Sequence, residues 1–200
     1  VSSLGVTEAA ETPQGGMILG EAGQFDVTFE LVVANMGGES LRQVQVSDDL
    51  GTLFGGDAIL IGVTEPIVDG AFITTVNPNY DGGNTVELLS GSDQLAGGEQ
   101  GTIQFSARFE ASTGVALSSQ AVGQAIDVNS VLVQDLSQNG ATPDPDGDGN
   151  PQNNSVPTVI TPGFRAELGL AQKLDVLNSG PQNNGPWQIQ LSYKLENLGN

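Results

Sequence analysis

Strict alternation of side-chain character over residues 25–33 restricts the fold of this chain more than any other feature. The apolar positions of this stretch are Phe25, Val27, Phe29, Leu31 and Val33. Because successive side chains of a β-strand point to opposite faces, a period of two predicts a strand with one buried face. No window of the chain keeps apolar residues at i, i+3, i+4 and i+7, the spacing of an amphipathic helix, so we expect no long helix.

Shorter apolar runs, separated by turn residues, follow along the rest of the chain. They lie at 44–46, 58–63, 72–76, 85–89, 103–109, 128–133 and 156–160. Glycine makes up 28 of the 200 residues, and it supplies the positive φ angles that tight reversals need. Strands this numerous, joined by short turns and without helices between them, pack as two facing sheets. The sequence therefore predicts an all-β fold, an immunoglobulin-like antiparallel β-sandwich with Greek-key connections.

The charge of the chain argues against two classes of partner. Lys and Arg number 5 against 24 Asp and Glu, which gives a formal net charge of −19 at pH 7. Such a surface repels the phosphates of nucleic acids and anionic lipid headgroups. No run approaches the roughly 20 apolar residues that a membrane-spanning helix needs. We therefore expect no nucleic-acid partner and no membrane span in this segment.

The chain contains no His and no Cys. It lacks the imidazole base, the thiolate nucleophile and the usual zinc ligands, so Ser-His-Asp and Cys-His catalysis are excluded. An enzyme that works with carboxylates alone would need two acids facing each other across a cleft, and the spacing of the acids predicts no such pair. We expect no enzymatic activity.

The end of the chain repeats its beginning. At an offset of 162, the apolar positions of residues 25–33 match Trp187, Ile189, Leu191, Tyr193 and Leu195. At the same offset the turn at 35–37 matches Asn197-Leu198-Gly199, and at an offset of 164 residues 4–6 match Leu168-Gly169-Leu170. Two similar amphipathic strands can occur by chance in an all-β protein, but the matching turn and upstream strand favour a repeated module.

The repeat divides the chain into two parts. We predict one complete β-sandwich module over 1–162 and, over 163–200, the opening strands of a second, truncated module in tandem repeat. Strands left unpaired in such a module can complete a sheet with a neighbouring copy by strand addition. The predicted partners are therefore neighbouring copies or adjacent modules of the same protein.

An acidic loop at 144–154 has the composition of a calcium site. Asp144, Asp146 and Asp148 occupy alternate positions, and Gly147 and Gly149 allow the backbone to curl around an ion. Calcium takes roughly six to eight oxygen ligands, and carboxylates two residues apart converge on one ion if the loop bends sharply. We expect these three aspartates to be the core ligands of Ca²⁺.

Three further residues complete the predicted calcium shell. Asn150 and Asn154 can add amide oxygens, and Asp135 can close the shell from a neighbouring strand. The loop is not an EF-hand, because the twelfth position counted from Asp144 is Ser155 instead of Glu and no helices are predicted beside it.

A solvated acidic linker is the other interpretation of this loop. The regular spacing of the acids, the glycines at the bends and the net charge favour calcium. Prolines at 143, 145, 151, 157 and 162 stiffen the stretch, which we expect to form the boundary loop of the module over about 135–162. Calcium there would fix the angle between modules. Asp48-Asp49 is a weaker cation candidate, and a strand-end turn explains it better.

Four segments in order resemble a known family. They are Val-Gln-Val-Ser-Asp-Asp-Leu at 44–50, Leu-Leu-Ser-Gly-Ser-Asp-Gln-Leu at 88–95, Asp-Leu-Ser-Gln-Asn-Gly at 135–140, and the acidic run at 144–157. This series resembles the conserved repeat domain of unknown function eleven, which supplies tandem immunoglobulin-like modules to very large bacterial surface proteins. The resemblance implies secretion, a place at the cell surface or in a filament, a stalk or adhesive role, and no catalysis. It also carries the acidic loop over to Asp144, Asp146, Asp148 and Asn150.

These observations together predict a structural function. We expect a non-catalytic tandem repeat of an extracellular bacterial surface adhesin or fibre, made rigid by calcium at the module boundary. The alternative is a calcium-dependent module that binds a surface carbohydrate or protein. Only 5% of the residues are aromatic, which argues against a sugar-binding platform.

Overall fold

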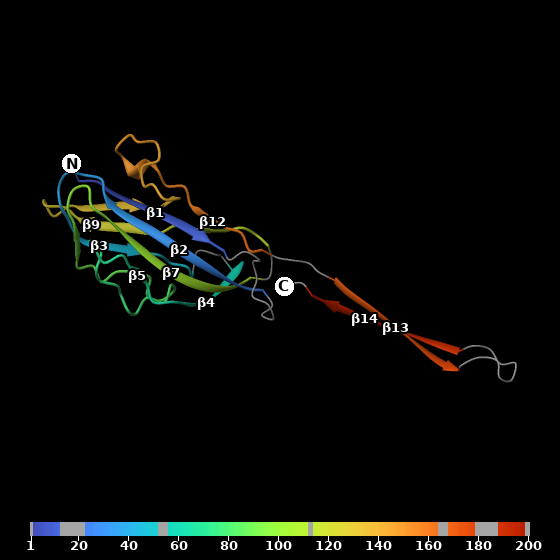
Figure 1. Ribbon diagram of the computed structural model, residues 1–200. Helices are drawn as coiled ribbons and strands as arrows, with labels where there is room; N and C mark the ends of the chain where they lie inside the picture. The colour runs from blue at the N-terminus through green and yellow to red at the C-terminus, as the bar shows by residue number, and fades with distance from the viewer. Residues whose placement is uncertain are drawn as a thin grey trace.

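The computed structural model describes residues 2–12, 23–51, 56–111, 114–163, 168–178 and 188–198. In these ranges the strands β1 to β12 build a β-sandwich, and β13 (Leu168–Asn178) pairs with β14 (Gln188–Asn197) in a separate hairpin (Figure 1). The only helix in the same ranges is the short 3-10 helix η1 (Pro151–Asn153). No described helix therefore has the length and apolar character needed to cross a membrane.

The first sheet is built around β2 (Gln24–Asn35). Its neighbours are β1 (Leu4–Glu11) on one side and β7 (Gln100–Ala111) on the other. Beyond β7 lie β4 (Ala58–Val63) and the short β5 (Ile67–Val68), and beyond β1 lies β11 (Gln138–Asn139). The pairing of β1 with β11 is parallel, and the other pairs of this sheet are antiparallel.

The second sheet has the order β10-β9-β3-β6, with all its pairs antiparallel. Its strands are β3 (Leu41–Ser47), β6 (Asp93–Leu95), β9 (Val122–Ile126) and β10 (Leu132–Leu136). A further antiparallel pair joins β8 (Leu117–Ser119) to β12 (Thr158–Ile160).

The strand order confirms the predicted fold class. The series β1-β2-β7-β4 in one sheet and β10-β9-β3 in the other is the A-B-E-D and G-F-C order of an immunoglobulin sandwich. The fold is therefore an immunoglobulin-like antiparallel β-sandwich with Greek-key connections. The strand β6 is an addition to this plan, because it follows β4 and β5 in the chain but pairs at the edge of the second sheet beside β3.

The core is filled by the alternating apolar side chains that the sequence predicted to be buried. The apolar side chains of β2 that are completely buried are Phe25, Val27, Phe29, Leu31 and Val33. The ring of Phe29 stacks on that of Phe105 in β7 at a centroid distance of 5.0 Å, and Tyr80 meets Phe105 edge-on at 5.2 Å. A Cβ at Gly123 in β9 would overlap Cγ2 of Val6, so the two sheets approach here only because this residue is glycine.

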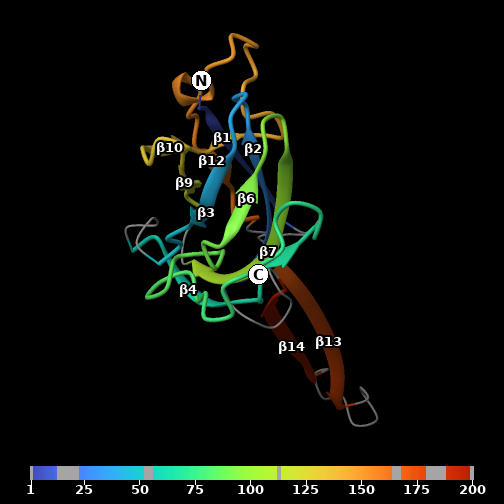
Figure 2. The ribbon, with the colours of Figure 1, turned by 90° about the vertical axis from the view of Figure 1, so that its left-hand side faces the viewer.

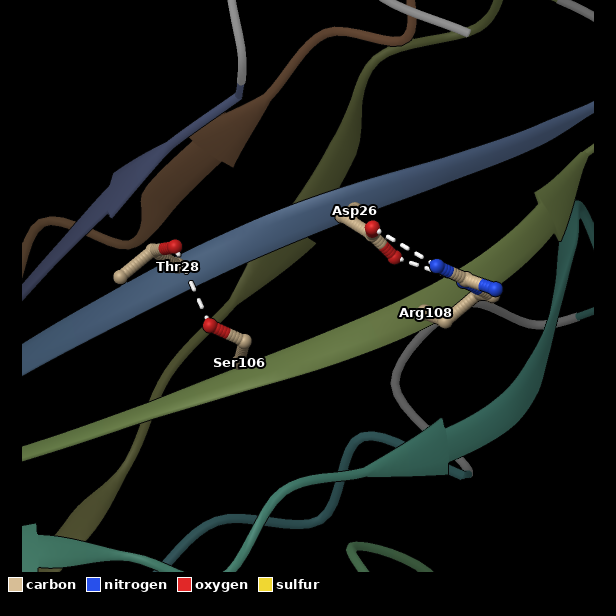
Figure 3. Close-up of polar contacts among 4 residues, drawn as sticks. All are labelled: Asp26, Thr28, Ser106 and Arg108. Carbon is tan, nitrogen blue, oxygen red and sulfur yellow. Dashed lines mark hydrogen bonds and ion pairs between the residues drawn. The ribbon is translucent and has the colours of Figure 1, made fainter. Parts of the chain in front are cut away.

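The polar side chains of β2 pair with those of β7 on the outer face of the first sheet (Figure 3). Asp26 stands opposite Arg108, and the guanidinium donates to both carboxylate oxygens at 2.8 and 3.0 Å. Two residues further on, the hydroxyls of Thr28 and Ser106 are 3.2 Å apart. The period of two therefore gives β2 one apolar face and one face of cross-strand polar pairs.

The second hairpin has the register of the first. Leu4 of β1 pairs with Asn35 of β2, and their matches Leu168 and Asn197 pair in the same way. The agreement continues through eight successive pairs, as far as Glu11 with Thr28 in the first hairpin and its match in the second. Trp187, the match of Phe25, lies outside the described residues. The repeat found in the sequence is therefore also a repeat of strand pairing.

Much of the stretch at 135–162 is part of the sandwich. Residues 132–136 form β10, residues 138–139 form β11 beside β1, and residues 158–160 form β12 beside β8. The loop proper, with η1, lies between β11 and β12. The apolar runs expected at 128–133 and 156–160 overlap β10 and β12, whereas β11 has only two residues and was not predicted, so the boundary loop is shorter than expected.

Candidate metal centre

The acidic loop lies at the end of the sandwich where β1 begins. Figures 1 and 2 show it next to the N-terminus of the chain. Pro143 and Pro151 pack on Gly5 of β1, where a Cβ would lie 2.7 and 3.0 Å from their Cβ atoms. The chain then runs along β1, since Thr158 Oγ1 donates to the carbonyl oxygen of Glu8 at 2.7 Å. The loop is thus anchored at the end of the module where β1 begins. Residue 163 does not follow the loop directly, because β12 lies between them.

The loop brings the three predicted core ligands together. Asp144, Asp146 and Asp148 each offer a carboxylate oxygen, and these oxygens lie within 4.8 Å of one another. Backbone amides of Gly147 and Gly149 donate to the two oxygens of Asp144 at 3.0 and 2.8 Å. Both glycines have positive φ, at 70° and 81°, so the sharp bend that the spacing required is present.

The two predicted amide ligands lie at the rim of this group. The Nδ2 of Asn154 donates to Asp146 Oδ1 at 3.3 Å, so a metal contact through Oδ1 of Asn154 would require its amide to turn. The backbone N–H of Asn150 donates to Asp148 Oδ1 at 2.7 Å, and its carbonyl accepts from Asn154 at 3.4 Å. Both residues therefore contact the aspartates, with nitrogen as the contacting atom.

The structure places Asp135 apart from the three aspartates. It is buried in β10, and its Oδ2 accepts a hydrogen bond from the backbone N–H of Val6 at 2.8 Å. Burial raises the pKa of this carboxyl to about 6, although the Val6 amide works against the shift. Asp135 thus joins the second sheet to β1 and does not close the calcium shell.

The arrangement of the loop suits a hard cation. Three carboxylates that each give one oxygen supply about half of a calcium shell, and solvent can supply the rest because Asp146 and Asp148 are exposed. The same carboxylates also accept hydrogen bonds from the loop itself. The loop therefore holds its bent shape through its own backbone, as a preformed site does.

A second group of acids lies in the core. The sequence marked Asp48 only as a weaker cation candidate, and it did not single out Glu8. Glu8 of β1 and Asp48, just after β3, are both buried. Burial raises the pKa of each carboxyl, and the charge of Glu8 raises the pKa of Asp48 further. The available signal was the place of Glu8 on the alternation of β1, where Leu4 and Val6 precede it on the core face.

Comparison with known proteins identifies no family. The chain matches no protein-family model, and no curated protein sequence matches it. A variant of BcpA, the major pilin subunit of Bacillus cereus, has a TM-score of 0.41 and 9% identity, over 98% of this chain and 56% of the pilin chain. The full-length major pilin SpaD from Corynebacterium diphtheriae has a TM-score of 0.38 and 14% identity, over 97% and 49%.

An enzyme is among the other similar structures. The exo β-N-acetylglucosaminidase of Vibrio harveyi has a TM-score of 0.36 and 12% identity, over 70% of this chain and 18% of the enzyme. The chain spans about half the length of the pilins. Because every one of these TM-scores is below 0.5, neither the pilins nor the glycosidase carries a function to this chain.

Proposed function

We propose that this chain is a non-catalytic structural repeat of an extracellular bacterial surface fibre or adhesin, in which immunoglobulin-like modules follow one another. The observation that carries the proposal is the second hairpin, which repeats the sequence and the register of the first. When the first hairpin of a module occurs twice in one chain, a tandem array of modules explains it.

The exposure of the second hairpin supports this proposal. Its apolar side chains Ile189, Leu191, Tyr193 and Leu195 are 57%, 44%, 60% and 66% exposed, whereas their matches in β2 are completely buried. Several exposed apolar side chains side by side on one sheet face mark an interaction surface. In the first module the second sheet covers this face, so the occupant that fits is a sheet of the β10-β9-β3-β6 type that belongs to the same module as the second hairpin.

The extracellular location rests on the sequence. The resemblance to the repeat domain of bacterial surface proteins supports it. The lack of His and Cys supports the non-catalytic part of the proposal, because it leaves little catalytic chemistry. A strongly acidic surface keeps repeated modules soluble and apart from one another.

A fusion tests the repeat directly. Residue 198 matches residue 36, so a second copy of residues 37–162 placed after residue 198 supplies the missing sheet. We expect two folded sandwiches, and hence a heat capacity change of unfolding about twice that of the original chain. As a control, the fusion with Leu191→Asp and Tyr193→Asp should keep one folded module. If the added segment stays unfolded behind the unaltered hairpin, the second hairpin is not a module start.

Calcium at the acidic loop is the finer part of the proposal. The convergence of Asp144, Asp146 and Asp148 supports it, and the packing of the loop on Gly5 means that an ion would stiffen the end of the module where β1 begins. In a tandem array, that end faces the module before it. Calcium would therefore act on a module junction other than the one that leads to β13.

Thermal unfolding tests the calcium site. An ion bound only to the folded state stabilises it by about 2.7 kcal/mol at a concentration of 100 times the dissociation constant. We expect calcium to raise the Tm of the original chain relative to chelator, and Asp146→Asn with Asp148→Asn to make that rise smaller. An equal rise in both proteins would mean that calcium does not bind at this loop.

A calcium-dependent binding module is the second candidate function. The observation that favours it is the exposure of Asp146 and Asp148, which would leave an ion partly open to solvent and to the hydroxyls of a carbohydrate. A glycan array probed with the chain in calcium, and again in chelator, separates the two candidates, since a purely structural repeat binds no glycan in either.

A further inference from the structure

Three buried oxygen-bearing side chains meet in the core of the sandwich. Glu8 comes from β1, Asp48 from the turn after β3 and Ser119 from the end of β8, and their exposures are 0%, 1% and 0%. No hydrogen bond of ordinary length and angle reaches four of their oxygens, namely Glu8 Oε1, both carboxylate oxygens of Asp48, and Ser119 Oγ. A buried polar atom without a partner is rare in folded proteins, and here four occur in one group.

The other contacts of these residues hold them in place. Glu8 Oε2 accepts from the backbone N–H of Ala121 at 3.0 Å and from the hydroxyl of Ser137 at 3.1 Å. The backbone N–H of Asp48 donates to the carbonyl of Val86 at 2.8 Å. One oxygen of Glu8 is thus satisfied by the protein while the other is left open.

The pairing of Ser119 with Thr158, whose hydroxyl donates to the Glu8 carbonyl at 2.7 Å, places Ser119 beside Glu8. Electrostatic effects add Asp48 to the group. The charge of Glu8 raises the pKa of Asp48, and the hydroxyl of Ser119 lowers the pKa of both carboxyls. Tyr80 borders the same group, because its pKa is raised by burial and then by the charges of Asp48 and Glu8. The cluster therefore contains two carboxyl groups and one hydroxyl that lie close together in the core.

No positive side chain balances these two acids among the described residues. Arg42 donates to Ser130 and Arg108 pairs with Asp26 on the outer face of the first sheet, while both lysines lie in the second hairpin. Neither carboxyl has a basic group among the causes of its pKa shift. A buried carboxylate pair without a counter-charge strongly destabilises a fold unless it binds a cation or takes up a proton.

We propose that Glu8, Asp48 and Ser119 form a buried site for one divalent cation, distinct from the acidic loop. Two carboxylates neutralise a charge of +2, and the open atoms are all oxygens, the ligands that hard cations prefer. Calcium fits best, because its flexible coordination accepts a hydroxyl, one oxygen of Glu8 and both oxygens of Asp48. The ion would join β1 of the first sheet to the turn after β3 in the second.

The second hairpin provides a natural comparison for this site. The match of Glu8 there is Gln172, which pairs with Tyr193 as Glu8 pairs with Leu31. A neutral amide is thus already used at this position of the repeat. Glu8→Gln is therefore a conservative variant, and the buried site belongs to the first module alone.

Counting retained ions tests the proposal on the full chain. The chain is unfolded in chelator, refolded in Ca²⁺, passed through a column in chelator and analysed by native mass spectrometry. An ion in the exposed loop exchanges quickly and is lost, whereas an ion in the core leaves only when the module opens. We expect one retained Ca²⁺ in the original chain and in Asp146→Asn with Asp148→Asn, and none in Glu8→Gln with Asp48→Asn.

Several outcomes would overturn the buried site. An original chain that retains no ion means that the acids share a proton or hold water, and Glu8→Gln with Asp48→Asn would then unfold at a higher temperature than the original in any buffer. Retention by that double variant places the ion elsewhere. If the double variant does not fold, Ser119→Ala decides, because it keeps both acids. It should release the ion about tenfold faster, and an unchanged release rate contradicts the site.

Discussion

The first and second hairpins share a sequence pattern and a register, yet they differ completely in burial. In β1–β2 the alternate side chains lie in the core of a sandwich, while in β13–β14 the matching side chains face outward. The pairing of two strands is thus encoded locally, by alternation and by the turn residues. Burial depends on a second sheet, which comes from residues far along the chain. The comparison separates what the hairpin specifies from what the rest of the module contributes.

Core truncation should give the largest difference between the two hairpins. Phe29 is completely buried against Phe105, whereas its match Leu191 is 44% exposed. We expect Phe29→Ala to lower the free energy of unfolding by about 3–5 kcal/mol, because it leaves a cavity. Leu191→Ala should change it by less than about 0.5 kcal/mol. Urea unfolding followed by circular dichroism measures both, and similar losses would mean that the second hairpin is covered in solution.

A pH-dependent effect should follow from Asp135, which ties the second sheet to Val6 of the first hairpin. Its pKa in the folded protein is about 6, above the usual value of 3.8, so the folded state holds the proton more tightly. Stability from this group is therefore present at low pH and is lost as pH rises through about 6. We expect Asp135→Asn to raise the Tm at pH 7 by roughly 2–4 °C.

The same substitution should have little effect at pH 4, where the carboxyl of the original chain is already largely protonated. The asparagine can still accept the hydrogen bond from Val6, so the variant isolates the charge. A stabilisation of equal size at pH 4 and pH 7 would show that packing, and not the charge, is responsible.

The outer face of the first sheet should show the smallest effect. Asp26 and Arg108 form a two-pronged ion pair, but their side chains are 39% and 46% exposed. Exposed pairs contribute about 0.2–1 kcal/mol, and salt weakens them. We expect Arg108→Ala to cost less than about 1 kcal/mol in low salt and less still in 1 M NaCl, measured by urea unfolding. A loss of unfolding free energy as large as that of Phe29→Ala would mean that the ion pair stabilises the fold far more than its exposure predicts.

The sequence predicted the parts of the fold that follow from a regular pattern. Alternation at 25–33 gave the central strand and its buried face, and the absence of helical spacing gave the all-β class. The short strands β8 and β11 have three and two residues, so no period could be recognised, whereas β12 lies within the apolar run at 156–160. The partner of β11 is β1, which lies more than a hundred residues away in the chain, and the partner of β8 is β12.

The candidate sites show the same difference between residues placed by a local pattern and residues placed by long-range packing. The spacing of Asp144, Asp146 and Asp148 is local, and the structure brings these residues together. Asp135 is contributed by a strand whose position only the whole fold determines. Asp48 follows its strand as predicted, but its burial against Glu8 comes from the meeting of two sheets and leaves no trace in the sequence around either residue.

The short parallel strand β11 has a consequence for how the protein behaves in concentrated solution. It pairs with β1 at Thr7 and Glu8, and the N–H of Gly140 donates to the Glu8 carbonyl at 3.0 Å, so the outer edge of β1 is partly closed. Open strand edges are where β-proteins stick to one another and form aggregates. Among the described residues β13 has no such cover on its outer edge. The outer edge of β14 is likewise unpaired there, so precipitation of the purified chain should start at the open edges of this hairpin, whereas the two residues of β11 protect the edge of β1.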